Sequence, residues 1–408
     1  MSTTSADRPL APDDERDSAA AVPVLRGRGD SLVPPPTRQL RIAMIGQKGV
    51  PATYGGVEHH VEQLGARLAA RGHHVDVFCR PTYDADATPT YLGMHRRTTW
   101  TVGTKHLDAI VHSLVSSAYS VADRPDIVHY HALGPTLAAP LVRGLSSARL
   151  VVTVHGLDHE RAKWGPAAHG VLGLAHWMTA RVPHATVVVS QALAEHYAER
   201  FDRRCTYIPN GVASPVHRPA VEIRRRWGLQ PGGYVLYVGR LVPEKAPDLL
   251  LRAYRQVPGD LPLVVAGGSS FTDGYVAGLQ EAAGRDPRVR LCGYVYGDTL
   301  AELYSNAAVF VQPSLLEGMP LTLLEAASYG TPVVASDIAP HREIAGKYAD
   351  AAHLFPTGDA DALADRIKRV ITAPDPVAAE LLRRHVLTTF QWDAAALALE
   401  RLYLDLTA

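Results

Sequence analysis

Cysteine is scarce in this chain. Its three cysteines, Cys79, Cys205 and Cys292, lie far apart along 408 residues. An odd number at such spacing predicts neither a disulfide framework nor a metal cluster. Because each lies at or beside an apolar strand-like run, we expect three buried free thiols in a reducing cytoplasm.

The chain also lacks an excess of charge of either sign, because 41 lysines and arginines balance 41 aspartates and glutamates. This balance argues against a nucleic-acid-binding protein that relies on bulk positive charge. No apolar run approaches the roughly 18 residues needed to span a bilayer. The N-terminus also has no apolar core of the kind found in signal peptides. We therefore expect a cytoplasmic protein.

The rest of the composition, 47% hydrophobic and 20% charged residues, is typical of a globular protein. A chain of 408 residues exceeds what one hydrophobic core usually supports, so two domains are expected. Residues 1–38 are rich in proline and contain no aromatic residue. Such a segment cannot bury enough apolar surface to become ordered, so we predict a disordered tail.

From residue 39 onward, short apolar runs alternate with amphipathic stretches of helical length, which predicts parallel βα units. We expect one doubly wound domain over 39–215 and a second over 216–391. Ligands of such sheets bind at the carboxyl ends of the strands, so the cleft between the domains is the expected site. The last helix, within 392–408, is expected to pack back on the first domain. The strands predicted are Arg41–Gly46, His74–Cys79, Ile127–Tyr130, Leu150–His155, Thr186–Ser190, Tyr234–Val238, Leu263–Ala266, Val289–Cys292, Val309–Val311 and Pro332–Ala335.

Two carboxylates, Glu317 and Glu325, are separated by seven residues across a loop that leads into a short helix. Pro320 suits the first helical turn and Gly330 suits the left-handed residue after the last, so we predict a helix from Pro320 to Tyr329. Its N-terminus offers unpaired backbone N–H groups and the positive end of the helix dipole to an anion such as a diphosphate.

The two carboxylates suit the sugar parts of such a ligand. Glu317 beside an anion site would repel a bare phosphate, so it is expected to face sugar hydroxyls. Glu325 can accept two hydrogen bonds from a ribose diol, as acidic residues do in dinucleotide-binding folds. Taken alone, the pair more simply suits a solvated loop residue and a surface helix residue, and the rest of the sequence favours the ligand-binding interpretation.

A second loop, after the first strand of the second domain, carries two cations. Gly239 allows close backbone approach, while Arg240 offers a planar fork and Lys245 a point charge at the carboxyl edge of the sheet. Together they can hold both phosphates of a nucleoside diphosphate. Two solvated cations, one of them paired with Glu244, are the competing interpretation.

In the first domain the corresponding loop contains Gly55 and Gly56 directly before a helix, followed by Glu58. The paired glycines can let the helix N-terminus approach an anion or a sugar. The loop matches neither a GxGxxG fingerprint nor a GxxxxGK[ST] phosphate-binding loop. A plain tight turn explains it equally well.

A third loop of the first domain begins at His155, at the carboxyl end of a strand. There the imidazole can bond a sugar hydroxyl or orient an acceptor. Asp158, Arg161, Lys163 and Trp164 follow, and they can form part of an acceptor pocket in which the indole stacks on a sugar ring. A solvated loop anchored by Trp164 is the alternative.

We predict no metal site. The triplet from Asp84 to Asp86 lies in a polar loop, and the triplet from Asp359 to Asp361 is typical of a helix N-cap. No group of residues has the spacing of a zinc site.

Together these residues resemble the family-four glycosyltransferases of the GT-B architecture, from about residue 40 to the end of the chain. The resemblance rests on Glu317-x7-Glu325, Gly239-Arg240 with Lys245, Gly55-Gly56 and His155-Gly156, in the order expected of that family. It implies an α/β GT-B fold of two Rossmann-like domains facing across a cleft. It also implies a retaining, metal-independent transfer from a nucleotide-diphosphate sugar, with no cofactor.

The resemblance also implies a role for each matching residue. Arg240 and Lys245 would stabilise the departing diphosphate, Glu317 would position the donor sugar and Glu325 would hold the ribose. Because a diphosphate oxygen can take the acceptor's proton, His155 would position the acceptor. Further donor contacts are expected from Gly239, Gly293, Val295, Gly318, Met319, Pro320, Leu321, Gly55 and Gly56, and acceptor contacts from Glu58, Asp158, Arg161, Lys163 and Trp164.

A narrower likeness concerns residues 48–60 and 155–165, which are similar to a bacterial subgroup that contains polysaccharide rhamnosyltransferases. It implies a role in polysaccharide or glycoconjugate synthesis, with a glycan, lipid-linked or small-molecule acceptor and rhamnose from a dTDP donor. His159 stands where that subgroup usually has an aromatic residue. A basic patch of His95, Arg96, Arg97 and Lys105 leaves peripheral membrane contact open. Two rivals also stay open: a nucleotide-sugar epimerase of the same fold, and a non-catalytic sugar-nucleotide-binding partner.

Overall fold

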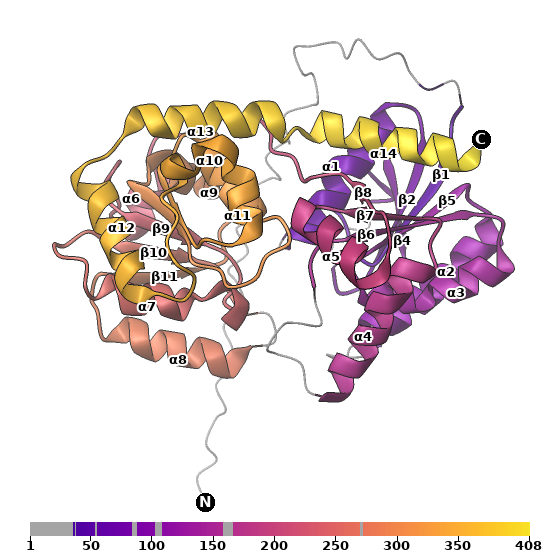
Figure 1. The fold of residues 1–408 in the computed structure, drawn as a ribbon, viewed down its shortest axis with the longest axis horizontal. Helices are drawn as coiled ribbons and strands as arrows, with labels where there is room; N and C mark the ends of the chain where they lie inside the picture. Colours follow the sequence, from indigo (N-terminus) through magenta and orange to yellow (C-terminus); the bar gives the residue numbers. More distant parts are fainter. Residues whose placement is uncertain are drawn as a thin grey trace, which may run out of the picture. The chain divides into compact units, whose positions relative to one another are not determined.

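Two separate β-sheets form the framework of the fold (Figure 1), as the alternating apolar runs predict. A computed structural model describes residues 36, 38–53, 55–83, 88–102, 108–157, 166–269 and 272–408. The predicted tail lies outside the described residues except for positions 36 and 38. Asp84, Asp86 and Lys105 also lie outside them.

The first sheet has eight strands in the order β3-β4-β2-β1-β5-β6-β7-β8, and all neighbours are parallel except β3 and β4. Its strands are β1 Arg41–Ile45, β2 His74–Cys79, β3 Thr90–Tyr91, β4 Met94–Thr98, β5 Ile127–His131, β6 Arg149–Val154, β7 Ala185–Val188 and β8 Thr206–Tyr207. The five apolar strands predicted here are present. Strands β3 and β8, with two residues each, and the polar β4 were not predicted.

The helices of this domain follow their strands in βα order. They are α1 Gly56–Ala70, α2 Asp108–Asp123, the 3-10 helix Gly134–Ala138, α3 Ala139–Leu145, α4 Pro166–Arg181 and α5 Gln191–Phe201. Helix α1 buries Val61, Leu64 and Leu68, spaced at the helical period, against the sheet. It begins after Gly55, whose φ of 107° is a conformation that favours glycine.

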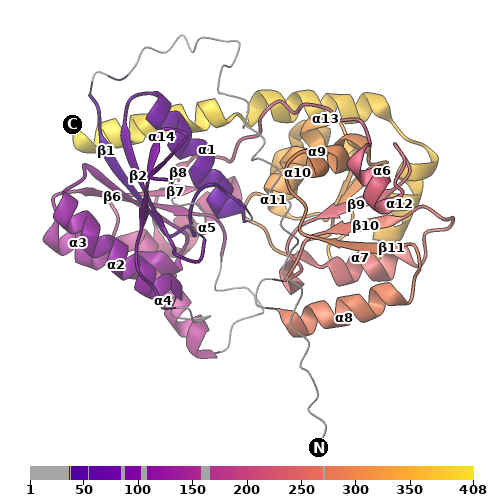
Figure 2. The ribbon, with the colours of Figure 1, turned by 180° about the vertical axis from the view of Figure 1, so that it is seen from behind.

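The second sheet has five parallel strands in the order β11-β10-β9-β12-β13. They are β9 Val235–Val238, β10 Leu263–Ala266, β11 Val289–Gly293, β12 Val309–Gln312 and β13 Val333–Ala335, close to the predicted ranges. Figures 1 and 2 show α7 and α8 on one side of this sheet and α9 and α10 on the other. The helices of this domain are α6 Glu222–Trp227, the 3-10 helix Pro243–Lys245, α7 Pro247–Tyr254, α8 Asp273–Gly284, α9 Gly297–Asn306, α10 Leu321–Ser328, α11 Ala339–Ala345, the 3-10 helix Gly346–Ala352, α12 Ala360–Thr372 and α13 Pro376–Thr389, and the chain continues into α14 Trp392–Thr407. The predicted pair of doubly wound α/β domains is confirmed.

Helix α10 is one residue shorter at each end than the sequence predicts. Pro320 has an extended ψ of 113° and is the N-cap, so the predicted place for this proline inside the first turn is wrong. Gly330 has the predicted left-handed φ of 73°. The predicted N-cap at Asp359 is confirmed, because its carboxylate accepts hydrogen bonds from the N–H groups of Asp361 and Ala362.

The three cysteines are free, but the prediction that all are buried is wrong for two of them. Cys79 is buried in β2, which has a strand on either side. Cys205 precedes β8 and Cys292 lies in β11, and both are only half-buried. β8 and β11 are edge strands, so only one neighbouring strand covers each.

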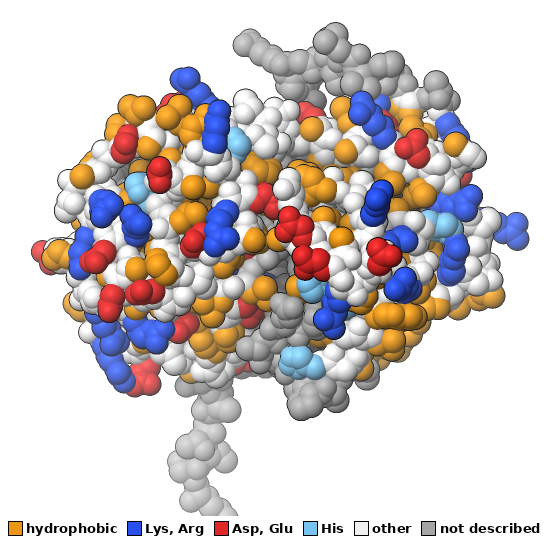
Figure 3. Space-filling model, in the orientation of Figure 1, with side chains coloured by type: hydrophobic (Ala, Val, Ile, Leu, Met, Phe, Trp, Pro, Cys, Tyr) orange, Lys and Arg blue, Asp and Glu red, His pale blue; other side chains and the backbone are white. Residues whose placement is uncertain are grey.

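The described surface carries charges of both signs. On the face shown in Figure 3, Lys and Arg side chains lie among Asp and Glu side chains. Among the described residues, no helix is both long enough and apolar enough to cross a membrane.

Helix α14 packs on α1 of the first domain, as Figures 1 and 2 both show. A buried carboxylate joins the two elements, since Glu400 accepts hydrogen bonds from Arg71 Nε at 2.7 Å and from His73 Nε2 at 2.8 Å. Burial alone would raise the pKa of Glu400, but these two partners hold it below its ordinary value of 4.5. Glu400 therefore stays ionised at neutral pH, and its hydrogen bonds hold α14 against the first domain.

Replacing Glu400 with alanine is expected to lower the free energy of unfolding by about 3 kcal/mol at pH 7, because Arg71 and His73 lose a buried partner. A depressed carboxyl pKa contributes stability above the unfolded value, and that contribution is lost as pH falls through the folded value. The difference from the parent should therefore shrink below about pH 4.5. Urea unfolding across pH checks this, with the exposed ion-pair residue Glu281 replaced by alanine as the control. An unchanged midpoint for Glu400→Ala would contradict it.

Candidate functional site

The carboxyl ends of neighbouring strands bring the predicted loops together in each domain. Strands β1, β5 and β6 are adjacent in the first sheet, so the residues that follow them lie side by side. Strands β9 and β12 are adjacent in the second sheet, and the N–H of Leu315 donates to the carbonyl of Glu244 at 2.8 Å. The cation-bearing loop and the loop that precedes α10 are therefore joined.

Lys245 and Glu317 form an ion pair at the centre of this junction, with 2.5 Å between Nζ and Oε1. Only 14% of the Lys245 side chain and 8% of the Glu317 side chain are exposed, so the alternative of solvated loop charges is wrong for both. Burial alone would raise the pKa of Glu317, but Lys245 and neighbouring hydrogen bonds hold it below its ordinary value. The site therefore holds an ionised carboxylate at neutral pH, paired with the side-chain nitrogen of Lys245.

Two further side chains orient Glu317, and sequence analysis did not single them out. Gln312 Nε2 donates to Glu317 Oε1 at 3.0 Å, and Ser314 Oγ donates to the same oxygen at 2.7 Å. The Gln312 amide is itself fixed, because its oxygen accepts from Thr322 Oγ1 on the first turn of α10. The available signal was a polar residue at the end of the apolar run Val309–Val311.

The loop before α10 touches the first domain. A Cβ added to Gly318 would lie 1.9 Å from the carbonyl oxygen of His155, so only glycine fits there without movement. Asn210 Nδ2 donates to the carbonyl of Met319 at 3.0 Å. A Cβ on Gly56 would lie 3.7 Å from Leu321. The predicted residues Gly318, Met319 and Leu321 thus face the loops of the first domain, next to Pro320, which is buried.

The remaining predicted donor residues of the second domain line the same sheet edge. Gly239 and Arg240 directly follow β9 and are half-buried. Gly293 ends β11 with a left-handed φ of 66° and is exposed, while Val295 packs against the core. Beside them the rings of Tyr294 and Tyr296 stack with 6.0 Å between centroids, an aromatic pair that sequence analysis did not consider.

Glu325 is half-buried on α10 and bonded to Tyr304, so it is not the solvated surface residue of the alternative interpretation. Its carboxylate accepts a hydrogen bond from Tyr304 at 3.0 Å. Burial raises the pKa of Glu325 to about 7, although this hydrogen bond acts in the opposite direction. Glu325 lines a cavity of about 220 Å³ formed by α1, residues 211–215, α9 and α10.

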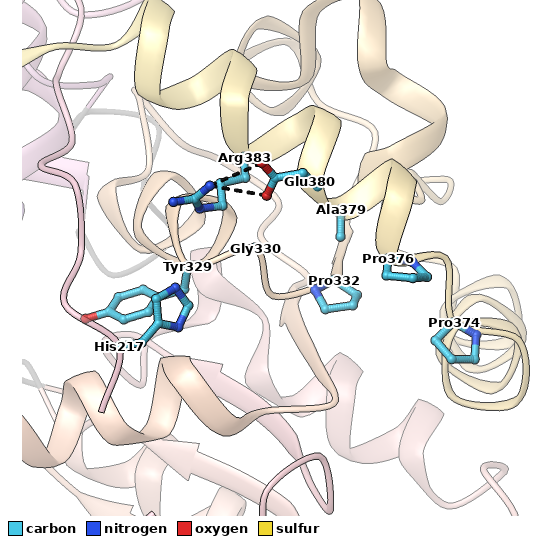
Figure 4. A pocket seen from close by; sticks show the side chains of 9 residues that line it. All are labelled: His217, Tyr329, Gly330, Pro332, Pro374, Pro376, Ala379, Glu380 and Arg383. Atoms are coloured by element: carbon cyan, nitrogen blue, oxygen red, sulfur yellow. Dashed lines mark hydrogen bonds and ion pairs between the residues drawn. The ribbon is translucent and has the colours of Figure 1, made fainter. Parts of the chain in front are cut away.

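A larger cavity of about 430 Å³ lies elsewhere, between α13, the end of α10 and the segment that carries His217. In Figure 4 the ring of Tyr329 lies beside that of His217, and Arg383 pairs with Glu380 on the same helix, α13. None of the predicted site residues lines it. The size of a cavity therefore does not identify the candidate site in this protein.

In the first domain Glu58 forms a hydrogen bond with the loop that follows β1. Its Oε1 accepts the N–H of Lys48 at 3.0 Å, and only 7% of the residue is exposed. This contact ties Lys48, in the loop after β1, to the first turn of α1, whose N-cap is Gly55. Binding of an acceptor by Glu58 stays a prediction, as do the roles of Asp158, Arg161, Lys163 and Trp164, which lie outside the described residues.

His155 lies beside two histidines that the sequence did not connect with it. His131 ends β5 and places its Nδ1 3.4 Å from Nε2 of His155. The ring of His60, on α1, lies 4.5 Å from that of His155 between centroids. Burial lowers the pKa of His60 to about 4 and that of His131 well below its ordinary value. Two neutral imidazoles therefore adjoin the predicted acceptor-positioning residue.

Comparison with known proteins agrees with this geometry. A family model described as "Glycosyltransferase Family 4" matches residues 54–214, and one described as "Glycosyl transferases group 1" matches residues 221–384. The chain is 30% identical over 379 residues to a D-inositol 3-phosphate glycosyltransferase of Mycolicibacterium paratuberculosis, covering 83% of each chain.

Two solved structures have the same fold. Sucrose-phosphate synthase from Thermosynechococcus elongatus superimposes with a TM-score of 0.77 and 26% identity, over 90% of this chain and 99% of that chain. HepE from Anabaena, solved in complex with UDP and glucose, superimposes with a TM-score of 0.74 and 18% identity, over 90% of this chain and 100% of that chain. With its cationic loop and helix N-terminus at the junction of two Rossmann-like domains, the chain belongs to the family-four glycosyltransferases of the GT-B fold.

Proposed function

We propose that this protein transfers a hexose from a nucleotide-diphosphate sugar to a hydroxyl of a glycan, lipid-linked or small-molecule acceptor, with retention of anomeric configuration and without a metal ion. One observation carries the proposal: two contacts are made by consecutive residues. Glu317 pairs with Lys245, and the next residue, Gly318, packs against the backbone carbonyl of His155. These contacts place a cation, a carboxylate, a helix N-terminus and an imidazole-bearing loop around one point. A role in bacterial polysaccharide or glycoconjugate synthesis, with rhamnose as one candidate sugar, follows from the narrower likeness.

The negative charge that develops on the leaving diphosphate determines the role of each group at the site. As the bond from the anomeric carbon to the diphosphate oxygen breaks, negative charge grows on the diphosphate. Lys245, Arg240 and the N-terminal N–H groups of α10 stabilise that charge. The acceptor oxygen forms its bond to the anomeric carbon on the same face, and its proton passes to a diphosphate oxygen. Electrostatic stabilisation by protein groups then replaces the metal ion.

Glu317 and His155 hold the two sugars on either side of this step. With Gln312 and Ser314 orienting its carboxylate, Glu317 accepts hydrogen bonds from donor-sugar hydroxyls. His155, opposite Gly318, positions the acceptor hydroxyl. The UDP and glucose bound by HepE, which shares the fold, support a uridine or similar nucleotide as the first donor to test.

A donor screen followed by product analysis tests the function. Nucleoside diphosphates that bind only the folded protein should raise its melting temperature, which identifies the base. Incubation of the matching nucleotide sugar with candidate acceptors should then give a glycoside whose anomeric configuration, read by proton NMR, equals that of the donor. An inverted product would exclude retention, and isomerisation of the donor without an acceptor would indicate an epimerase.

Replacing Gly318 with alanine is expected to weaken binding of the nucleotide sugar about 30-fold. The added methyl group would overlap the His155 carbonyl, a backbone atom that no rotamer change can move aside, and such overpacking costs about 2 kcal/mol. Isothermal titration calorimetry with the nucleotide sugar measures the effect. Gly278→Ala, with nothing near the added methyl, is the control. Unchanged affinity for the Gly318 variant would show that the two loops need not touch.

Binding of the ribose is expected to depend on the ionisation of Glu325. Only the carboxylate can accept two hydrogen bonds from the ribose diol, and its folded pKa is about 7. Affinity for a nucleoside diphosphate should therefore fall as pH drops from 8 to 6, by up to tenfold per pH unit below the pKa. The 2′,3′-dideoxy analogue carries the same titrating diphosphate, so it is the control and should show a weaker dependence. Equal pH dependence for both ligands would remove Glu325 from the ribose site.

A further inference from the structure

We propose that His60, His131 and His155 form a binding site for a borderline-soft divalent transition-metal ion such as Zn²⁺, and that occupancy of this site inhibits transfer. Within the described part of the chain, these three form the one group of three or more metal-ligating side chains close enough to share an ion. Each offers a nitrogen, and these nitrogens lie within 4.8 Å of one another.

The spacing of two of the imidazoles already fits a zinc ion. Two nitrogens bound tetrahedrally at 2.0–2.1 Å from zinc are about 3.3 Å apart. Nδ1 of His131 and Nε2 of His155 lie 3.4 Å apart. His60 completes the site after a small shift, because its ring lies 4.5 Å from that of His155 between centroids.

The tautomer of His60 is the one that a metal ligand requires. Asn210 donates its Nδ2 hydrogen to the carbonyl of Met319, which leaves Oδ1 as an acceptor facing His60. Nδ1 of His60 must therefore carry the proton in the 2.8 Å hydrogen bond to Oδ1. Its Nε2 then holds a lone pair, and this atom is buried without a hydrogen-bond partner. A metal-binding histidine is usually oriented by such a hydrogen bond through its other nitrogen.

His131 faces the same space, whereas a nearby histidine is held elsewhere. Nδ1 of His131 is the nitrogen 3.4 Å from His155 Nε2, and its other nitrogen, Nε2, is buried without a hydrogen-bond partner. His129, whose ring lies 4.2 Å from that of His131, bonds Tyr403 and Thr153 through its two nitrogens and cannot join the site. Three imidazoles with no carboxylate among them favour Zn²⁺, Cu²⁺, Ni²⁺ or Co²⁺ over Mg²⁺ or Ca²⁺. His155 is half-buried, which gives the ion a way in from the side of the predicted acceptor.

Binding at this site would remove His155 from the acceptor, so Zn²⁺ should inhibit transfer in competition with the acceptor. This consequence rests on the proposed function, whereas the binding itself does not. A metal held here acts as an inhibitor, which is consistent with transfer that needs no metal.

Direct metal titration of the full chain, after treatment with a chelator, tests the site independently of activity. Zn²⁺ competition with a chromogenic chelator should show one high-affinity ion, and Co²⁺ should give the visible absorption of a tetrahedral nitrogen site. His60→Asn keeps an N–H for Asn210 and removes the Nε2 ligand, so the fold should be retained. Loss of a ligand should cost at least as much as loss of an orienting partner, so we expect affinity to fall by at least about 100-fold.

A second histidine pair provides the control. The rings of His74 and His95 stack on the surface of β2 and β4, with 4.3 Å between centroids, and can hold a metal adventitiously. His74→Ala with His95→Ala should leave the high-affinity ion in place. The proposal is wrong if the parent binds no Zn²⁺ tightly, if His60→Asn binds it equally well, or if the control variant loses it. Zn²⁺ binding with unchanged kinetics of an active enzyme would refute the inhibitory role.

Discussion

Replacing Lys245 with alanine is expected to lower kcat for sugar transfer by about 1,000-fold. In the proposed mechanism Lys245 faces the charge that develops on the leaving diphosphate, and removal of one preorganised group of this kind costs about 100- to 1,000-fold. The upper end applies because Lys245 is only 14% exposed, so water cannot replace its charge easily. Steady-state kinetics with saturating nucleotide sugar measures the effect.

A second expected effect distinguishes loss of the Lys245 charge from unfolding of the variant. Without Lys245, Glu317 loses the partner that lowers its pKa, and burial should raise that pKa. Lys245→Arg retains the charge and should therefore recover part of the activity, although its planar fork does not reproduce the ammonium geometry. Lys368→Ala breaks an exposed pair on α12 and should leave kcat unchanged. A Lys245→Ala enzyme within threefold of the parent would remove this residue from the site.

Replacing His155 with alanine is expected to lower transfer by at least about 100-fold while leaving nucleotide affinity unchanged. The imidazole is proposed to orient the acceptor, and misplacement of a reactant by about 1 Å can cost 100-fold. The carbonyl that meets Gly318 belongs to the backbone and remains in the variant. The donor side of the site should therefore stay intact.

Two readouts distinguish this role from a structural one. Slow hydrolysis of the donor needs no positioned acceptor sugar, so its rate should change much less than the rate of transfer. His155→Asn, which keeps one polar group, should recover part of the transfer rate. His74→Ala, on β2 and part of a surface ring pair, is the matched control. Near-normal transfer by His155→Ala would show that this residue does not position the acceptor.

Periodicity was sufficient to predict the two domains, because every strand with a long apolar run was found. Periodicity failed where the local pattern of apolar residues does not indicate a strand. β4 was missed because four of its five residues, His95, Arg96, Arg97 and Thr98, are polar or charged. Half-burial of Cys205 and Cys292 depends on strand order, and order at the sheet edges cannot be read from a run of apolar residues.

The site residues that belong to a sequence motif could be predicted, whereas the others could not. Glu317, Gly318 and Lys245 follow strand ends, and strand ends of a parallel sheet converge. The hydrogen bonds from Gln312 and Ser314 to Glu317 depend on side-chain directions that spacing does not show. The histidine cluster draws on α1, β5 and β6, so it exists only once the chain is folded.

Glu58 shows how a side chain can have a structural contact that its sequence position does not reveal. A carboxylate near a glycine pair at the start of a helix is predicted to contact the acceptor, and that contact stays a prediction. In the structure that carboxylate accepts the Lys48 N–H. Residue type and position alone do not distinguish a side chain that binds a ligand from one that holds the loop.

A crystal structure with a bound nucleoside diphosphate tests the central claim most directly. The account predicts a diphosphate within hydrogen-bond distance of Lys245 Nζ and of the backbone N–H groups at the start of α10, with the contact between Lys245 and Glu317 opened or shared. A nucleotide bound elsewhere, for example in the cavity beside Tyr329 and Arg383 (Figure 4), with the Lys245–Glu317 pair undisturbed, would contradict it.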